Sequence, residues 1–494
     1  MNLRCRYKHS LLWAVMVAVG LGTSMASAAA DEPSPVLFTP AREGLPKGKI
    51  WKSQIAFGDI NGDGFADLGT ISRLADGPYV WRGDGKGNWV SASNGLPRET
   101  FCGGGMAFGD ANSDGKTDVA IADHCKGVFL YLGDGEGNWK NASAGLPSSG
   151  SEDVAVGDFN GDKCLDLAVV TTSEQGVRAF AGNCKGVWKE SSKGLPHEEW
   201  GNAIEMVDVD GDGHLDVIAA YAAGPRVWRG DGKGNWSEAS EGLPAPEIHG
   251  LYWGIAVGDV NGDGKIDIAS GAAVPGVEVF IQEQGESGPK WRRAIDGIVP
   301  MNALGVAFGD LDKDGKTDLV VAGKTNLDEI GGVYGIFPFF GDGNGTWKLR
   351  ENTGLPNNGR ERTWGVGLPD IDGDGVLDVA GAFGDVLNPS WRSGPKIGTD
   401  VPSTFKKGFG TLKPGMSVSE VEAAIGEKVP TPSFFSGLAE DEFEVVMYEH
   451  FKLRFSNSTF GGDKLIEAKG PEKRGSPERG YFGAIEVWRG QLSK

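Results

Sequence analysis

The sequence predicts an all-β fold: a seven-bladed β-propeller of four-stranded blades, with a small α+β module inserted in or appended to the last blade. Two observations support this prediction. The acidic stretch AFGDINGDGFADL at residues 56–68 recurs in seven copies, whose first aspartates lie 51, 48, 50, 51, 51 and 60 residues apart. Short apolar runs and Gly-rich turns surround every copy, and these runs are too short for helices. A period near 50 residues with four short strands per repeat is typical of propeller blades.

Each repeat contains four predicted strands in a constant order. An apolar run such as QIAFGD comes before the acidic loop, and a second run such as ADLGTI follows it. A third run, for example YVWRG, leads into a hairpin such as GDGKGNW (residues 83–89), whose Trp begins the fourth strand. The tripeptide GLP then closes the unit at residues 95–97, 145–147, 194–196, 242–244 and 354–356.

Blade seven is expected to draw strands from distant parts of the chain. Residues 36–46 (VLFTPAREGLP) resemble a fourth strand with its GLP, so we expect them to pair into blade seven and remove an exposed sheet edge. Residues 483–490 (GAIEVWRG) resemble the third strands and are expected to fill that place. The alternative third strand is NPSWRSG (388–394), although its proline suits a central strand poorly. The expected domains are a signal peptide at 1–30, the propeller at 31–391, the module at 392–478 and a returning strand at 479–494.

The module is predicted to contain one helix and a few strands. Ser417 and Glu420 form an S-x-x-E capping box, and Gly426 suits the end of the helix. Apolar-rich strands are expected at 444–455 and 464–470. The pattern GMSVSEVEAAIG followed by strands resembles the small SmpA/OmlA-like modules of bacterial envelope proteins, which implies a contact with another protein.

The acidic loops crowd like charges together, and a hard cation would offset their repulsion. Calcium takes about six to eight oxygen ligands from carboxylates, amides, backbone carbonyls and water. Positions 1, 3, 5 and 9 of each loop offer side-chain oxygens, position 7 offers its backbone carbonyl, and glycine at position 6 permits the sharp turn. A plain polar turn is the alternative, since Asp, Asn and Gly also dominate turns without an ion. Seven copies with one ligand order favour calcium as the cofactor, with up to seven ions.

The predicted calcium ligands, loop by loop, are Asp59, Asn61, Asp63, Phe65 and Asp67; Asp110, Asn112, Asp114, Lys116 and Asp118; Asp158, Asn160, Asp162, Cys164 and Asp166; Asp208, Asp210, Asp212, His214 and Asp216; Asp259, Asn261, Asp263, Lys265 and Asp267; Asp310, Asp312, Asp314, Lys316 and Asp318; and Asp370, Asp372, Asp374, Val376 and Asp378.

Four cysteines follow the predicted signal peptide, an even number that favours disulfides in an exported chain. Cys102 and Cys125 are expected at the same end of blade two, and Cys164 and Cys184 at the opposite end of blade three. We therefore predict the disulfides Cys102–Cys125 and Cys164–Cys184. The third loop has Lys163 in place of the glycine at position 6, and the second disulfide is expected to offset this loss.

The amino-terminal segment and the charge indicate where the protein works. A basic start, an apolar core from about Leu11 to Leu21 and small residues near Ala28 form a secretory signal, which is too short for a stable membrane span. We expect a periplasmic, secreted or cell-surface location, and no later segment is predicted to cross a membrane. The formal net charge of −20 and the pI near 4.8 argue against nucleic acid, whose binding needs a basic surface.

The acidic loops resemble FG-GAP/VCBS repeats, which are known from bacterial exported proteins and from integrin α-subunit heads. The stretches 56–59, 107–110 and 307–310, each reading AFGD, carry the match together with the DGxxD that follows. The resemblance covers about residues 36–385. It implies a seven-bladed propeller with calcium in the hairpins between strands one and two, and a protein or glycan ligand. The chain departs from the family in having GLP where a Gly-Ala-Pro element is expected.

The face opposite the acidic loops is the expected ligand surface. It carries the varied segments between each GLP and the next first strand, and these are rich in aromatic residues and arginine, which are favoured binding anchors. The alternative for each Trp is a structural wedge between blades. The candidate ligand-binding residues are Trp51, Trp200, His249, Tyr252, Trp253, Arg362 and Trp364.

The leading expectation is therefore an exported, calcium-binding propeller that acts as a protein- or glycan-binding or adhesion module. One alternative is a polysaccharide lyase or hydrolase on the same face, and another is a structural component of the envelope. A lyase would need a base such as His197, His249 or Tyr252 near an arginine or a metal. The sequence assigns no catalytic residue.

Overall fold

The computed structural model describes the chain from Pro35 to Leu492, with gaps. The predicted signal peptide lies outside the described residues. No helix among the described residues is long and apolar enough to cross a bilayer. The residues left out are 1–34, 47–50, 52–53, 74–76, 173–175, 199–200, 222–223, 245–251, 273–275, 286–287, 326–332, 358–361, 385–406, 415, 427–441, 448–450, 457–464, 470–483 and 493–494.

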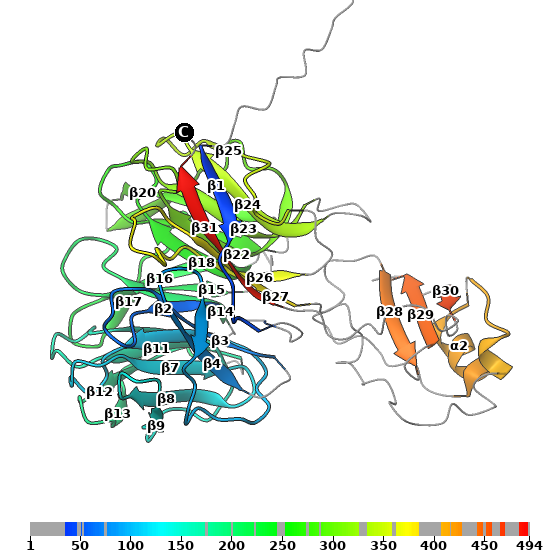
Figure 1. Cartoon of the computed structure of the whole chain (residues 1–494), viewed down its shortest axis with the longest axis horizontal. Coiled ribbons are helices and arrows are strands. Elements are labelled where there is room, and N and C mark those ends of the chain that lie inside the picture. Colours follow the sequence, from blue (N-terminus) through cyan, green and yellow to red (C-terminus); the bar gives the residue numbers. More distant parts are fainter. Residues whose placement is uncertain are drawn as a thin grey trace, which may run out of the picture. The chain divides into compact units, whose positions relative to one another are not determined.

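Within the described residues, seven four-stranded antiparallel sheets form the blades of a propeller, so the predicted fold class is confirmed (Figure 1). The first strands of neighbouring blades contact one another and lie innermost. These first strands are β2 (Ala56–Gly58), β6 (Met106–Gly109), β10 (Ser151–Gly157), β14 (Gly201–Val207), β18 (Tyr252–Gly258), β22 (Met301–Gly309) and β26 (Thr363–Gly367). The second strands are β3 (Asp67–Ile71), β7 (Asp118–Asp123), β11 (Asp166–Thr171), β15 (Asp216–Tyr221), β19 (Asp267–Ala272), β23 (Asp318–Thr325) and β27 (Val379–Phe383).

The outer half of each blade is a hairpin whose fourth strand is short. The third strands are β4 (Pro78–Gly83), β8 (Gly127–Gly133), β12 (Val177–Gly182), β16 (Gly224–Gly230), β20 (Val277–Gln284), β24 (Tyr334–Gly341) and β31 (Ile485–Leu492). The fourth strands are β5 (Trp89–Ser91), β9 (Trp139–Asn141), β13 (Trp188–Glu190), β17 (Trp236–Glu238), β21 (Pro289–Arg293), β25 (Trp347–Leu349) and β1 (Val36–Pro40).

Blade seven joins strands from both halves of the chain. Its order is β1-β31-β27-β26, with Ala380 opposite Val487 and Phe38 opposite Gly490. The red β31 and the blue β1 lie side by side in Figure 1. The chain thus leaves this sheet after β27 and returns to it at β31. The boundaries given above for the intervening module stay a prediction.

The intervening residues contain a helical stretch at 407–409, a longer helix and one small sheet. Helix α2 (Val418–Ile425) begins with the predicted capping box: Ser417 Oγ accepts the backbone N–H of Glu420, and the Glu420 carboxylate accepts the backbone N–H of Ser417. Gly426 ends the helix at φ +72°, in the left-handed region. The strands β28 (Glu442–Met447), β29 (Phe451–Ser456) and β30 (Leu465–Lys469) form an antiparallel sheet. The resemblance of this module to SmpA/OmlA-like proteins stays a prediction.

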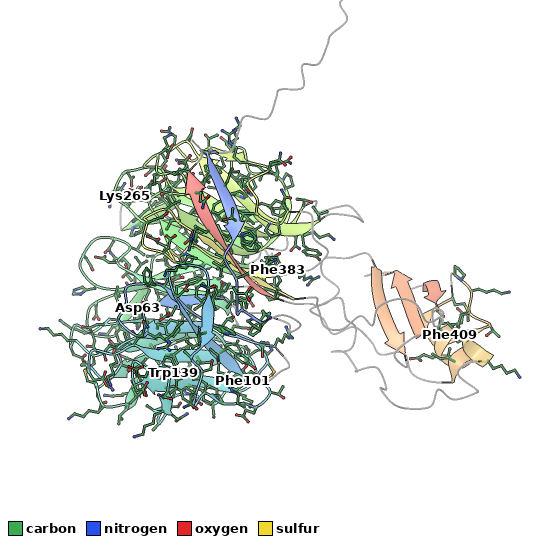
Figure 2. All side chains as sticks on the ribbon, viewed as in Figure 1. Asp63, Phe101, Trp139, Lys265, Phe383 and Phe409 are labelled. Atoms are coloured by element: carbon green, nitrogen blue, oxygen red, sulfur yellow. A yellow bond between two sulfur atoms is a disulfide. The ribbon has the colours of Figure 1, made fainter. Side chains whose placement is uncertain are left out.

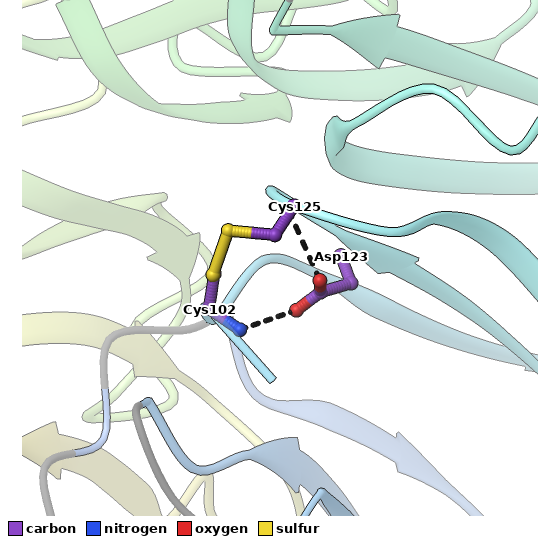
Figure 3. Close-up of side chains that lie close together, drawn as sticks. All are labelled: Cys102, Asp123 and Cys125. Atoms are coloured by element: carbon purple, nitrogen blue, oxygen red, sulfur yellow. Dashed lines mark hydrogen bonds between the residues drawn. A yellow bond between two sulfur atoms is a disulfide. The ribbon is translucent and has the colours of Figure 1, made fainter. Parts of the chain in front are cut away.

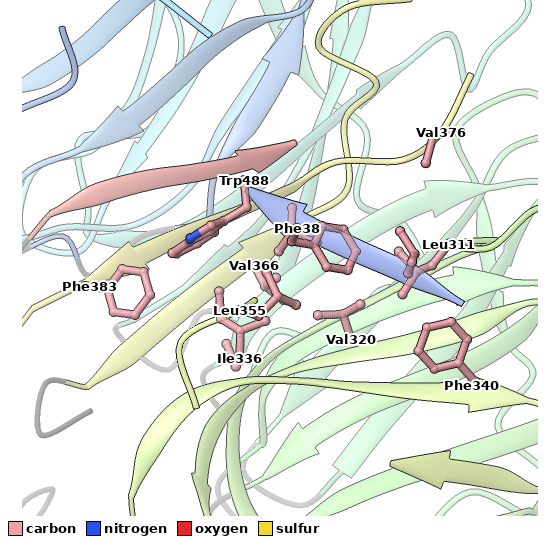
Figure 4. Packing of buried hydrophobic residues seen from close by; sticks show 13 residues of the cluster. Phe38, Leu311, Val320, Ile336, Phe340, Leu355, Val366, Val376, Phe383 and Trp488 are labelled. Atoms are coloured by element: carbon pink, nitrogen blue, oxygen red, sulfur yellow. The ribbon is translucent and has the colours of Figure 1, made fainter. Parts of the chain in front are cut away.

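The hydrophobic core lies between the blades rather than inside one of them. Seven clusters of buried apolar residues are described, and each one combines residues of two neighbouring blades. Figure 4 shows the cluster between blades six and seven, where Leu311 and Ile336 of blade six meet Val366 and Trp488 of blade seven. Burial of apolar surface is the main stabilising contribution, so each blade depends on both neighbours.

The segment that follows each fourth strand connects the outer edges of neighbouring blades. We call this segment the strap, and GLP forms its end. At six of the seven junctions, the residue before the glycine accepts a backbone N–H of the next fourth strand, as in Trp236 N–H to Lys193 O at 2.9 Å. Five indole N–H groups also donate to backbone carbonyls of the preceding blade, for example Trp139 to Ala92 at 2.7 Å. The glycine itself adopts φ between +84° and +99° at all seven junctions. At the junction of blades five and six, Gly297 of DGIVP takes this place although no GLP is present.

Candidate metal loops and channel mouth

The first aspartate of each acidic loop organises the turn around itself. In loop one, Asp59 Oδ1 accepts the N–H of Gly62 at 2.7 Å, and Asp59 Oδ2 accepts the N–H of Gly64 at 2.8 Å. The bond from position 6 recurs in all seven loops at 2.8 to 2.9 Å. Positions 4 and 6 both adopt positive φ, which explains why glycine occupies most of them.

The ninth residue of each loop is a buried aspartate that ties three segments together. Asp67 Oδ2 accepts the N–H of Ile60 within the loop, and Asp67 Oδ1 accepts the N–H of Gly83 on the third strand, both at 2.8 Å. The same pair of bonds occurs in every blade. Since a carboxylate oxygen has a second lone pair, these bonds do not prevent metal coordination.

Burial raises the pKa of all seven ninth-position carboxyls above the usual 3.8. Backbone hydrogen bonds oppose this rise, and the neighbouring loop carboxylates add to it. The pKa reaches about 6 for Asp67, Asp118 and Asp267, and about 7 for Asp166, Asp216, Asp318 and Asp378. A nearby cation favours the ionised form of a carboxyl. A bound metal would therefore offset the cost of ionising these buried groups, which an empty loop does not offset.

Three loops gather carboxylate oxygens closely enough to share one cation. The oxygens of Asp208, Asp210 and Asp216 lie within 4.8 Å of one another, and the same holds for Asp310, Asp312 and Asp318 and for Asp370, Asp372 and Asp374. In loop four, Asp210 Oδ1 is buried without a hydrogen-bond partner. Hard oxygen donors, one of them unsatisfied, fit calcium in kind. A calcium ion would there be held by positions 1, 3, 5 and 9 and the carbonyl at position 7, and it would neutralise the crowded charge.

The third loop forms despite its missing glycine. Lys163 takes the left-handed conformation at φ +69°, and its N–H still donates to Asp158 Oδ2 at 2.8 Å. The adjacent Cys164 is bonded to Cys184, with Cα atoms 5.0 Å apart. This disulfide is one of the two that the sequence predicts, and it ties the loop to the neighbouring hairpin.

The second predicted disulfide, Cys102–Cys125, is also confirmed and lies beside Asp123 (Figure 3). The sulfurs are bonded to each other, so they are not thiolate ligands for a metal. The Asp123 carboxylate accepts the N–H groups of Cys102 at 2.7 Å and of Cys125 and Lys126 at 3.0 Å. This cluster is therefore structural: the carboxylate and the disulfide together hold the end of β7.

The opposite end of the propeller carries a ring of bulged residues. In five blades the pairing of strands one and two skips one residue near the start of the first strand. A bulge re-aims the side chain of the residue that it leaves unpaired. The acidic loops follow the other end of the same strands, so this bulge ring lies at the opposite end of the central channel that a propeller fold encloses. Its members are Glu152, Asn202, Trp253, Leu304 and Trp364. Figure 2 shows the two ends: Asp63 and Lys265 lie on one side of the propeller, and Phe101 and Phe383 lie on the other.

Two indoles of the bulge ring contact each other across the channel mouth. Trp253 belongs to blade five and Trp364 to blade seven, yet their ring centroids lie 6.1 Å apart in an edge-to-face arrangement. Arg362 lies beside them, with its guanidinium carbon 5.6 Å from the Trp364 ring and its Nε donating to the Tyr334 hydroxyl at 3.2 Å. We call Trp253, Tyr334, Arg362 and Trp364 the mouth cluster. Three of these four residues are ligand candidates from the sequence.

The other ligand candidates do not join the mouth cluster. Trp51 is fully buried in the core between blades seven and one, where it packs as a wedge. Tyr252 is 1% exposed and its hydroxyl donates to Glu278, and burial raises its pKa. Trp200 and His249 lie outside the described residues.

Polar residues that sequence reasoning missed lie on blades two to four. Glu152 of the bulge ring is 6% exposed and contacts His124 Nδ1. Glu205 is the exposed residue of β14 and takes the place of the alanine in AFGD. That place is alanine in five other blades and Gly367 in blade seven. Water reaches its side chain, but surrounding protein desolvates it enough to raise its pKa to about 7. We therefore place it in the central channel, and its departure from the repeated alanine was the available sequence signal.

Fold and sites together define a propeller with acidic hairpins at one end and an aromatic mouth at the other. Four overlapping segments, residues 59–121, 110–169, 158–219 and 208–270, match the family model of the FG-GAP-like repeat. Residues 59–270 of this β-propeller thus contain FG-GAP-like repeats, as the resemblance implied. No protein among the curated sequences matches it.

Solved structures of two lectins resemble the fold at a distance. One is an Agrocybe aegerita lectin described by its specific recognition of non-reducing terminal N-acetylglucosamine, at 16% identity and a TM-score of 0.38, covering 64% of this chain and 84% of the lectin. The other is the BP39L lectin from Burkholderia pseudomallei, at 13% identity and a TM-score of 0.40, covering 69% of this chain and 94% of the lectin. Similarities at this level carry no inference about the ligand of this chain.

Proposed function

We propose that this protein is an exported, calcium-binding β-propeller that binds a protein or glycan ligand at its channel mouth. The contact between Trp253 and Trp364 carries the proposal, because it brings side chains of two non-neighbouring blades together where the channel opens. Export is supported by the predicted signal peptide and by two disulfides, which persist in oxidising compartments.

Calcium is supported by the donor set and its geometry. Every loop provides oxygens at the same positions, and in three loops three carboxylates converge within 4.8 Å. Without a cation these charges repel one another and strain the hairpin that joins the two inner strands. Metal binding to such a site is coupled to folding, so the ions would support the blades that carry the mouth cluster.

Ligand binding is supported by the chemistry of the mouth cluster. Trp253 is partly exposed. Arg362 of blade seven is connected to blade six by its hydrogen bond to the Tyr334 hydroxyl. Aromatic rings offer apolar contact area with little loss of conformational entropy, and arginine supplies several directed donors. Trp253, Tyr334 and Trp364 lie on β-strands, and Arg362 directly precedes β26, so the cluster is organised before a ligand arrives.

Binding is favoured over the enzymatic alternative. Of the three bases that a lyase could use, Tyr252 is buried with its hydroxyl bonded to Glu278, and His249 lies outside the described residues. His197 is exposed and lies near Glu190, and within the described part of the chain it makes no contact with the arginine of the mouth cluster. The named catalytic groups therefore do not converge in the described residues.

A glycan array probed with the full-length protein tests the proposal. We expect binding in calcium, and loss of binding both with a chelator and in the variants Trp253→Ala and Arg362→Ala. Arg292→Ala is the matched control, since Arg292 is exposed on an outer strand, where its guanidinium pairs with Glu283. Binding that persists in both mouth variants, with folding verified by thermal melting, would contradict a site at the channel mouth.

A further inference from the structure

The bulge ring at the channel mouth has a polar part and an apolar part. Blades three and four contribute Glu152 and Asn202 to it. Blades five, six and seven contribute Trp253, Leu304 and Trp364. Since neighbouring blades supply each part, the mouth is amphipathic, and the two parts meet where blade four adjoins blade five.

Asn202 has an acceptor oxygen that the described residues do not satisfy. The residue is 7% exposed, and its Nδ2 donates to the backbone carbonyl of Tyr252 at 2.6 Å. Because a carbonyl can only accept a hydrogen bond, this contact fixes the orientation of the amide. Within the described part of the chain, the other amide atom, Asn202 Oδ1, is buried without a hydrogen-bond partner. An unsatisfied buried acceptor destabilises a protein, so a ligand that brings a hydrogen-bond donor to this oxygen removes the loss.

The same amide lies next to the exposed indole of the mouth cluster. Tyr252, which accepts the bond from Asn202, directly precedes Trp253 in β18. Trp253 is partly exposed, whereas Trp364 is 8% exposed and donates its indole N–H to the carbonyl of Gly384 at 3.3 Å. Trp364 thus supports Trp253 from the side, and Trp253 is the ring that a ligand can cover.

Glu152 adds a second acceptor to the polar part. It is 6% exposed and contacts His124 Nδ1. An ionised carboxylate and an amide oxygen both accept hydrogen bonds from a hydroxyl, but neither can donate one to an anion. On the apolar side, Arg362 already donates to the Tyr334 hydroxyl. The polar part therefore selects a ligand that carries hydrogen-bond donors and no negative charge.

A pyranose ring matches both parts of the mouth at once. One face of such a ring consists of C–H groups that pack on an indole, and its edge carries hydroxyls that donate hydrogen bonds. Sites for small ligands commonly combine aromatic walls with a few placed polar groups. Since Asn202 Oδ1 is covered in the free protein, a neighbouring side chain must turn aside to admit the hydroxyl, which is common when ligands bind.

We propose that the channel mouth binds a neutral pyranose at the end of a glycan. The sugar ring stacks on Trp253, and one of its hydroxyls donates to Asn202 Oδ1. This inference rests on the ligand binding in the proposed function and narrows it to one class of ligand.

A glycan array and monodeoxy sugars test the inference with the full-length protein in calcium. The array should contain neutral hexose ends beside the matching uronic acids, and we expect binding to neutral ends. For the sugar that binds, each monodeoxy derivative is then titrated. Removal of one particular hydroxyl should weaken binding by about tenfold in the parent protein, because one hydrogen bond is lost. In Asn202→Ala the same derivative and the parent sugar should bind within about twofold of each other, since the acceptor is gone.

Asn235→Ala is the matched control for Asn202→Ala. It removes an amide of the same blade from the outer hairpin, where Asn235 Nδ2 donates to Asp231 Oδ2 at 2.7 Å. This variant should keep the tenfold effect of the missing hydroxyl. If Asn202→Ala does not fold, as judged by thermal melting, the deoxy series on the parent protein still decides, because no single hydroxyl that matters would overturn the inference.

The outcomes separate this inference from the proposal beneath it. Glycan binding that survives both Trp253→Ala and Arg362→Ala would refute the mouth as the ligand site. Binding at the mouth of acidic glycans only, or of a protein and no glycan, would overturn the neutral pyranose while leaving the mouth site intact. An equal hydroxyl effect in the parent protein and in folded Asn202→Ala would overturn the role of Asn202.

Discussion

The close contact between the strap and the next blade predicts a large loss of stability for the substitution Gly194→Ala. Gly194 has φ +99°, and a Cβ built on it would lie 2.0 Å from the backbone oxygen of Trp236 in the next blade. Gly211 is the matched control, since it has φ +74° in an acidic loop and no atom within 4 Å of its Cβ position. Both variants place alanine at positive φ, but only Gly194→Ala also forces two blades apart.

The expected costs follow from these contacts. Alanine in the left-handed region costs about 1–2 kcal/mol, which applies to both variants. At Gly194 the carbonyl must move by about 1 Å, which overpacks the junction at about 1–3 kcal/mol and weakens the bond from Trp236 N–H to Lys193 O by about 1 kcal/mol. Gly194→Ala should therefore destabilise the propeller by about 3–6 kcal/mol and Gly211→Ala by about 1–2 kcal/mol.

Thermal unfolding in saturating calcium measures the difference. An unfolding entropy of about 2.1 cal/mol/K per residue over roughly 350 propeller residues gives about 0.7 kcal/mol/K. The Tm should fall by about 4–8 °C for Gly194→Ala and by about 2 °C for Gly211→Ala. Gly145→Ala should lie between them, because its Cβ position is 3.0 Å from the Trp188 oxygen. Equal losses of Tm in all three variants would show that the close contact between the strap and the next blade adds nothing to the cost of the substitution.

Three further predictions concern the loops and the disulfides. Chelation should lower the Tm, since each site at a hundred times its Kd contributes about 2.7 kcal/mol; an unchanged Tm in excess EDTA would contradict bound calcium. In EDTA the protein should lose stability as the pH rises from about 4 to 7. The ninth-position carboxyls have pKa values of about 6 to 7 in the folded state against 3.8 in the unfolded state, so the folded state binds more protons. The stability that this proton binding adds is fully present below about pH 4 and is lost above about pH 7. Melting curves at several pH values, with and without calcium, check this, and the trend should disappear in calcium. Replacing Cys164 and Cys184 by serine opens a loop with a sequence separation of 20 and should cost about 3 kcal/mol in urea unfolding, whereas a loss below about 1 kcal/mol would contradict a stabilising role.

Much of the fold could be predicted because each repeat contains its own local chemistry. The aspartate at position 9 follows from the loop spacing alone, and its paired hydrogen bonds recur in every blade. The two disulfides followed from counting strands, since cysteines at one end of a blade must be close. Capping of α2 by Ser417 needed only four residues of sequence.

The candidate ligand site was harder, because it depends on which blades meet across an axis. Trp51, Tyr252 and Trp253 are all aromatic residues near the start of a first strand, but the first two are buried. The bulge that separates Trp253 from Tyr252 depends on strand pairing and has no residue signature. Likewise, the pairing of Arg229 with Asp210 joins residues 19 positions apart through a hairpin, which periodicity does not reveal.

The pairing of β1 with β31 has a consequence for how the ring is assembled during synthesis. The strand that is made near the beginning must wait without any strand partner until one made roughly 450 residues later reaches it. At a ribosomal rate of about 5–20 residues per second, that delay is tens of seconds. During this delay, the incomplete propeller exposes unpaired strand edges that can pair with a neighbouring chain. Chaperones that shield nascent chains should therefore matter most for this last step.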